Sequence, residues 1–235
     1  MNVLERAYKY LRVLLINSKN WYNIHKNVIK NHENYSLTKS NFPVYNLTNA
    51  NANEGAHTDN MHQVNDEEIK NMVEKVLKET DLNVAPIAIV SIANFYGFSV
   101  YEMPMDDSVS GLIMADDKNI EGFDAKQIIV VNSKHSSTRK RFTIAHELGH
   151  YFIQNKPSHC FAHRDAGNYS LEERYANNFA STLLMPEDEI IREVGNFKKT
   201  KIGEQPDSEL INYIANEFDV SQSAAAIRLK KLHII

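Results

Sequence analysis

The sequence predicts an α+β fold in which a small sheet packs on one buried helix and a helical region follows at the C-terminus. Three runs rich in strand-forming residues, 98–103, 111–115 and 127–131, predict the sheet. Apolar residues surround the segment 142–152, which is typical of a helix buried in a core. With 235 residues and 43% hydrophobic content, the chain is long enough for one generous domain or two small ones.

The first 65 residues differ in composition from the rest. Apolar residues recur at helical spacing from Val3 to Leu15, which predicts one amphipathic helix. Asparagine then becomes very common, from Asn17 to Asn60, and we expect a polar, partly disordered linker over about 36–65. The helix is open to two interpretations, a loosely docked appendage or a segment that binds a partner.

Two helices are expected ahead of the sheet. Asp66 can cap a helix whose apolar residues run from Ile69 to Leu77. Pro86 occupies a favourable first-turn position for a second helix, and Gly97 is a natural stop at its end. The sheet itself should be antiparallel and at least partly hairpin-connected, because turn residues separate its three runs.

Helices are also expected over the rest of the chain. Ser136 or Ser137 can cap the buried helix, Pro157 ends it, and a polar loop follows over 158–169. The next helix runs from about residue 171 to 185, where Pro186 stops it. Two more helices, 210–218 and 224–232, are joined by a short turn.

The buried helix contains the pattern H-E-x-x-H, formed by His146, Glu147 and His150. Two histidines four residues apart lie on one face of a helix, so both imidazoles can reach one metal ion. Glu147 lies beside them, where its carboxylate can take a proton from a metal-bound water. Because burying these polar groups without a metal would be unfavourable, the sequence predicts a zinc site of the hydrolase type.

A catalytic zinc usually has three protein ligands and one open position. The extended pattern with a third histidine is excluded, because Ile153 and Lys156 occupy its glycine and histidine positions. Five candidates for the third ligand remain downstream: His159, His163, Asp165, Glu172 and Glu173.

Glu173 is favoured as the third ligand. Asn177 lies one turn later on the same expected helix and can hold the free ring N–H of a ligand histidine. Ala176 and Ala180 are small, which lets this helix approach the histidine helix closely. Glu172 would point about 100° away on an ideal helix.

Composition limits the partners and the location. The net charge of −4 and the pI of about 6.2 argue against nucleic-acid binding by the chain as a whole. A single cysteine, Cys160, forms no internal disulfide, which suits a reducing compartment. The short apolar run 11–16 contains Arg12 and lacks a cleavage site, and no stretch is long enough to span a membrane. The expected location is the cytoplasm, without membrane contact.

The segments Arg139–His150, Glu173–Ala180 and Leu183–Pro186 occur together in this chain. With the ending Phe218–Ser221 and Ile227–Leu232, they closely resemble the ImmA/IrrE family of metallo-endopeptidases. The resemblance covers about 66–235 and leaves residues 1–60 unexplained.

The resemblance implies a zincin-like fold and hydrolysis of a peptide bond. It assigns His146, His150 and Glu173 as ligands of one zinc ion and Glu147 as the general base. The developing oxyanion also needs a donor besides the metal. Four side chains stay open for that role: Tyr175, His163, Arg139 and Arg141.

The resemblance also implies a class of substrate. Several family members cleave helix-turn-helix repressors, often encoded nearby on mobile elements, and so release transcription. The expected partner is such a repressor or an antitoxin-like protein. The expected domains are an N-terminal helix and Asn-rich linker (1–65), a zincin-like metallopeptidase domain (66–190) and a C-terminal helix-turn-helix-like region (191–235).

Two other functions fit parts of the sequence. A metal-containing DNA-binding regulator is one, because 214–229 has helix-turn-helix character and Arg228, Lys230 and Lys231 add local positive charge. Few base-reading side chains are present there, however, and the net charge argues against tight DNA binding. The other is a toxin–antitoxin or phage-defence interaction protein without proteolytic activity, which the N-terminal extension leaves open.

Overall fold

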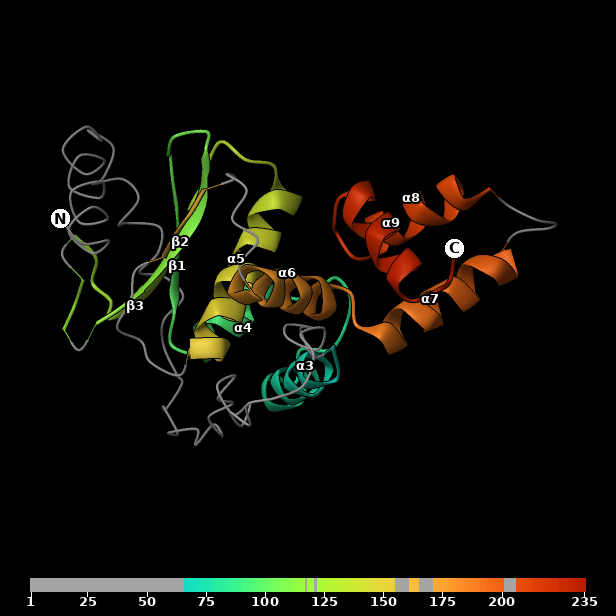
Figure 1. Cartoon of the computed structure of the whole chain (residues 1–235), viewed down its shortest axis with the longest axis horizontal. Coiled ribbons are helices and arrows are strands. Elements are labelled where there is room, and N and C mark those ends of the chain that lie inside the picture. The colour runs from blue at the N-terminus through green and yellow to red at the C-terminus, as the bar shows by residue number, and fades with distance from the viewer. Residues whose placement is uncertain (1–65, 117, 121, 155–160, 165–170, 201–205) are drawn as a thin grey trace, which may run out of the picture.

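The computed structural model describes residues 66–116, 118–120, 122–154, 161–164, 171–200 and 206–235. The amphipathic helix and linker expected over 1–65 lie outside these residues. Within the described part, a four-stranded sheet is combined with helices α3 to α9, so the predicted α+β class is confirmed (Figure 1). No helix there combines the length and the apolar character that crossing a bilayer requires.

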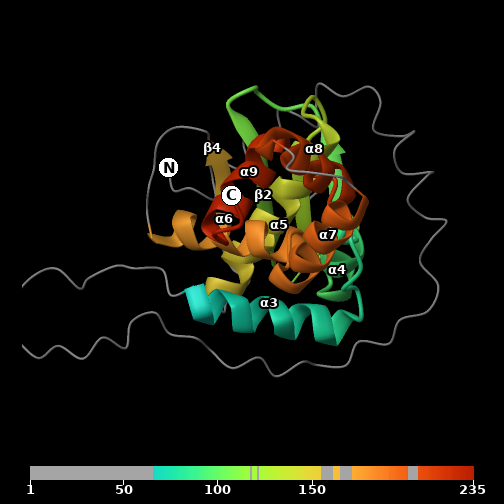
Figure 2. The ribbon, with the colours of Figure 1, turned by 90° about the vertical axis from the view of Figure 1, so that its right-hand side faces the viewer.

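Helices α5 and α6 lie between the sheet and α7–α9, and α3 runs along one side of them (Figures 1 and 2). The elements in chain order are α3 (Asp66–Thr80), α4 (Ile89–Phe95), β1 (Ser99–Met103), β2 (Val109–Ala115), β3 (Gln127–Asn132), α5 (Ser137–Gln154), β4 (Phe161–Arg164), α6 (Leu171–Leu184), α7 (Glu187–Thr200), α8 (Asp207–Glu217) and α9 (Gln222–Lys231). Helix α4 begins three residues after Pro86, later than the sequence predicts.

The sheet is mixed, because one of its three strand pairings is parallel and the other two are antiparallel. Its strand order is β1-β3-β2-β4, with β1 parallel to β3 and with β2 antiparallel to both β3 and β4. The prediction of an antiparallel neighbour was wrong for β1. Strand β2 does not pair with β1, and β3 lies between them, parallel to β1. Apolar runs locate strands in the sequence, but they do not determine which strands become neighbours.

Two elements were not predicted. Strand β4 lies within the expected polar loop 158–169, and its four residues are too few to show a period. Helix α7 begins directly after Pro186, which therefore ends α6 and starts the next helix, because its carbonyl accepts a hydrogen bond from the N–H of Ile190 at 3.0 Å. The predicted domain division after residue 190 falls within α7, and that division stays a prediction.

The two faces of β3 contact different apolar clusters. Ile129 and Val131 belong to the main core, which the helices share, whereas Ile128 and Val130 belong to a smaller cluster on the other face. This alternation is the period-two pattern of a strand that is covered on both sides. The main core also contains Phe218 between α8 and α9, so the C-terminal helices share a core with α5 and α6.

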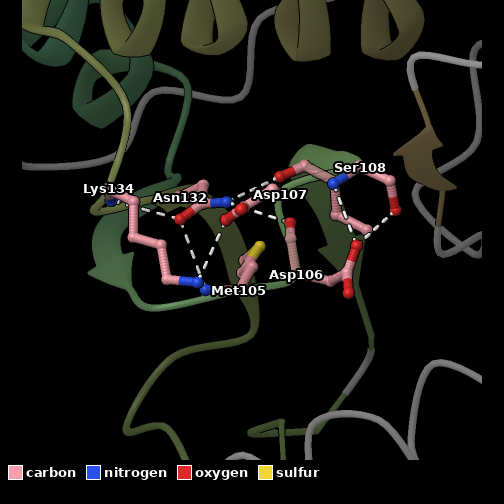
Figure 3. A network of polar contacts seen from close by, with 7 residues as sticks. Met105, Asp106, Asp107, Ser108, Asn132 and Lys134 are labelled. Carbon is pink, nitrogen blue, oxygen red and sulfur yellow. Dashed lines mark hydrogen bonds and ion pairs between the residues drawn. The ribbon is translucent and has the colours of Figure 1, made fainter.

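Asn132, at the end of β3, fixes the connection that leads into β2 (Figure 3). It is fully buried, and its Oδ1 accepts from the N–H groups of Met105 at 3.3 Å and Lys134 at 3.1 Å. Its Nδ2 donates to the carbonyls of Asp106 at 3.1 Å and Val109 at 2.9 Å. Four backbone groups thus find a partner in one side chain, which fixes the start of the strand that faces α5.

Candidate metal centre

Helix α5 holds two histidines with buried side chains. The hydroxyl of Ser136 accepts a hydrogen bond from the backbone N–H of Arg139 at 3.3 Å, so Ser136 caps the first turn. Leu148 is fully buried in the main core and anchors the helix there. His146 is only 4% exposed and His150 only 2% exposed, so neither is an ordinary surface histidine.

Helices α5 and α6 touch through their backbones at Gly149. A Cβ placed on this glycine would lie 2.9 Å from the Cα and 3.3 Å from the Cβ of Ala176. A contact of 2.9 Å is too short for a Cβ, so any side chain here would force the helices apart. Because α5 carries His146 and His150 and α6 carries Glu173, this contact sets the separation of the three side chains.

The three side chains offer their donor atoms at the separations that one tetrahedral ion requires. The Nε2 atoms of His146 and His150 are 3.1 Å apart. The carboxylate of Glu173 lies 3.6 Å from the first of these atoms and 3.4 Å from the second. Bonds to zinc of about 2.0–2.1 Å at tetrahedral angles place donor atoms about 3.3 Å apart. The cluster therefore fits a metal ion, and the 24% exposure of the Glu173 side chain leaves one side open.

Asn177 fixes the orientation of one imidazole. Nδ1 of His146 donates to Oδ1 of Asn177 at 2.9 Å, because an amide oxygen can only accept. The lone pair of His146 is then on Nε2, the atom that faces His150 and Glu173. A hydrogen bond at the second ring nitrogen is the usual way in which proteins orient a histidine ligand.

Glu147 follows His146 on α5, and its side chain lies between α5 and β2. It is 0% exposed, and a Cβ placed on Gly111 of β2 would lie 3.7 Å from its Oε1 and 2.5 Å from Cγ2 of Thr143. Only a glycine lets the strand approach α5 so closely. Burial, and then the negative charge of Glu173, raise the pKa of Glu147 well above its ordinary value of 4.5. A carboxylate with a raised pKa can accept and release a proton near neutral pH.

The raised pKa of Glu147 predicts a pH dependence of stability in the metal-free protein. The folded state binds this proton more tightly than the unfolded chain does. The resulting contribution to the free energy of unfolding is fully present below about pH 4.5, the ordinary pKa of the group, and is lost as the pH rises through the raised pKa of the folded state. Glu147→Gln removes this titration. Urea unfolding of chelator-treated proteins between about pH 5 and about pH 8 should therefore show the variant gaining stability relative to wild type. A constant difference across this range would contradict the raised pKa.

The contact at Gly149 predicts an unusual response to alanine. Alanine normally stabilises a helix interior by about 0.8–1 kcal/mol over glycine. Gly149→Ala should instead destabilise the protein by about 1–3 kcal/mol, because the added methyl group meets the backbone of Ala176. Gly195→Ala in α7 is the matched control, since a Cβ there meets nothing within 4 Å. Thermal unfolding should shift in opposite directions for the two variants, and a gain in both would mean that the helices are not in contact.

The candidate oxyanion donors lie in different places. Tyr175 is buried in the main core, two residues and hence about 200° around α6 from Glu173. Arg139 donates to Ser110 at 3.0 Å and lies eight residues before Glu147, about 12 Å along α5. Arg141 forms an ion pair with Asp219. His163 lies on β4, and its side chain is outside the described part.

The remaining ligand candidates are not brought to the cluster. Glu172 is exposed on α6, beside the partly buried Glu173. His159 and Asp165 lie outside the described residues. Among the groups the structure describes, the cluster of His146, His150 and Glu173 is the one able to hold a metal.

Gly111 and Gly149 contribute to the site but were not among the residues predicted from sequence. Both act through the absence of a side chain, which lets β2 and α6 approach α5. A glycine inside a strand and another inside a helix are the available signals, because each is locally unfavourable. The local sequence does not identify the partner of either glycine.

Two of the three C-terminal basic residues are engaged within the protein. Arg228 is 5% exposed, and its Nε donates to the carbonyl of Met185 at 3.1 Å. Lys231 forms an ion pair with Asp66 at 2.7 Å. The positive charge that favoured DNA binding is thus largely used in intramolecular contacts.

The site agrees with the family whose model the chain matches. A family model, the IrrE N-terminal-like domain of Peptidase M78, matches residues 96–230, more than half of the chain. Among solved structures, the chain is similar to a Mycobacterium tuberculosis transcriptional regulator, at 16% identity and a TM-score of 0.46. That match covers 69% of this chain and 46% of the other, so this chain spans less than half of that protein's length. No match is found among curated proteins.

Proposed function

Because the chain belongs to the Peptidase M78 family, with its IrrE N-terminal-like domain, we propose that it is a zinc-dependent endopeptidase. The observation that carries the proposal is the arrangement of His146, His150 and Glu173 beside the buried Glu147. The family supports a peptidase of the metal-dependent type. The use of zinc, the zincin-like mechanism and the substrate are our inference.

Zinc bound to these three ligands would supply a Lewis acid and an activated water. The protein's own contribution is to hold the ligands and to move a proton. His146 is held by Asn177 with its Nε2 toward the cluster, and the Gly149 contact holds Glu173 close to both histidines. Glu147 accepts the proton of the attacking water and returns it to the leaving amine, a role that its burial and raised pKa support.

We infer that the substrate is a helix-turn-helix repressor or an antitoxin-like protein encoded nearby. The resemblance of this chain to the ImmA/IrrE family supports that class of substrate. Cleavage would relieve repression. The reaction would take place in the cytoplasm. Cys160 is the single cysteine, so the chain has no internal disulfide, which suits a reducing compartment.

The substrate can be tested by co-expressing the chain with a helix-turn-helix protein encoded next to it. Mass spectrometry should find two fragments of the repressor with wild type and an intact repressor with Glu147→Gln. If wild type and Glu147→Gln both bind the repressor and neither cleaves it, the result would favour an interaction protein without proteolytic activity. Tight DNA binding with a steep salt dependence would favour a DNA-binding regulator.

A further inference from the structure

Two arginines outside the metal cluster connect the C-terminal helices to the helices that carry the ligands. Arg141 lies on α5, five residues before His146, and Arg228 lies on α9. Both are largely buried, and a guanidinium is retained in such a position only when its charge and its N–H groups are matched. Neither side chain belongs to the metal cluster.

Arg228 binds the end of α6. Its Nε donates to the carbonyl of Met185, the residue after the last one of the helix, at 3.1 Å. The final carbonyls of a helix lack partners within it and carry partial negative charge, so a cation is favourable there. Glu187 and Asp66 add negative charge around the guanidinium. Helix α9 is therefore tied to the helix that carries Glu173.

Arg141 binds the turn between α8 and α9. Its Nε donates to the carbonyl of Asp219 at 3.2 Å and lies 3.2 Å from the carboxylate of the same residue. Its Nη2 donates to the carbonyl of Ile87 at 2.9 Å. Asp219 has a φ of 49°, a left-handed conformation that ends α8 and turns its carbonyl toward α5. The helix that carries both histidines is thus tied to the same C-terminal pair.

The contacts of Arg141 with Asp219 and of Arg228 with Met185, here called the two ties, lie at a distance from the contact between α5 and α6. Arg141 lies eight residues from Gly149, about 12 Å along α5, and Met185 lies nine residues from Ala176, about 13 Å along α6. Rotation of one helix about this contact would change the distance from Glu173 to the histidines. Contacts far from a pivot resist rotation most effectively. Figure 2 shows α9 in front of α5 and α6, and the hydrogen bonds of Arg141 and Arg228 join the pair α8–α9 to both of these helices.

We propose that Arg141 and Arg228 are positioning residues for the metal site, which act by bracing α5 against α6 through the pair α8–α9. The proposal rests on the metal site described above. The C-terminal pair is then part of the machinery that sets metal affinity, rather than a separate DNA-binding module.

The test measures zinc affinity of the full chain by competition with a chromophoric chelator. Arg228→Met and Arg141→Met, which keep the apolar stems, should each weaken binding by about two- to thirtyfold. The double variant should bind zinc only slightly less tightly than the single variant with the lower affinity. Either substitution alone already removes the connection between α5 and α6 through α8–α9. Arg228→Lys should recover part of the affinity, since an ammonium can donate to the same carbonyl.

Arg192→Met is the matched control, because Arg192 pairs with Glu189 and Glu193 on the surface of α7 and should leave zinc affinity unchanged. A purely structural role would lower the melting temperature of the metal-free variants while zinc affinity stayed at the wild-type value, and that result would overturn the proposal. Additive losses in the double variant would also overturn it. If Arg228→Met does not fold, Arg228→Lys and Arg141→Met decide. Wild type without zinc affinity would instead contradict the proposed function itself.

Discussion

Glu147→Gln is expected to bind zinc as wild type does and to lose peptidase activity by about 10³-fold. Glutamine has nearly the same shape, so it fills the buried space between α5 and β2 beside Gly111. It cannot accept the proton of the attacking water. None of the three donor atoms at the cluster comes from residue 147, so the metal should remain. Zinc content is measured by elemental analysis, and cleavage of the co-expressed repressor by mass spectrometry.

Glu172→Gln is the control for this substitution, because it makes the same chemical change on an exposed side chain of α6. Its activity should equal that of wild type. Cleavage by Glu147→Gln at a wild-type rate would show that another group takes the proton. Loss of zinc from Glu147→Gln would show that residue 147 holds the site together rather than moving a proton.

Local signals predicted most of the helices and strands. Ser136 marks the start of α5, and the positive φ of Gly97, at 86°, is the helix stop that the sequence indicated. Local signals predicted the antiparallel pairing of β2 with β3 but not the parallel pairing of β1 with β3, because the neighbours of β1 depend on the path of the whole chain. Pro186 was interpreted only as the end of α6, although its carbonyl also accepts the first hydrogen bond of α7, which begins at the next residue.

The metal cluster was largely predictable because its chemistry is local. His146, Glu147 and His150 lie within five residues, and the small residue Ala176 indicated a close approach that the structure contains. The supporting contacts were not predictable. Arg228 looked like a DNA-binding charge in sequence, and only its burial against Met185 shows that it is an internal tie. Contacts between residues 43 positions apart have no signature in a single sequence.

Glu173→Ala is expected to weaken zinc binding by a factor of about 100 or more, because it leaves two histidines where a stable site needs three protein ligands. The carboxylate of Glu173 lies 3.4 Å from Nε2 of His150 and 3.6 Å from that of His146, within reach of a shared ion. Its neighbour Glu172 is exposed, so Glu172→Ala is the matched control and should keep its zinc.

The Glu173→Ala protein should still fold, because residue 173 is at the edge of the core and alanine favours a helix. Circular dichroism of the metal-free variants checks this before zinc affinity is compared. Zinc should raise the melting temperature of wild type and of Glu172→Ala but not that of Glu173→Ala, since a ligand stabilises only the state that binds it. Full zinc in Glu173→Ala together with its loss in Glu172→Ala would assign the third ligand to the other carboxylate. The two adjacent glutamates thus test the ligand assignment by position alone, because the chemical change is the same in both.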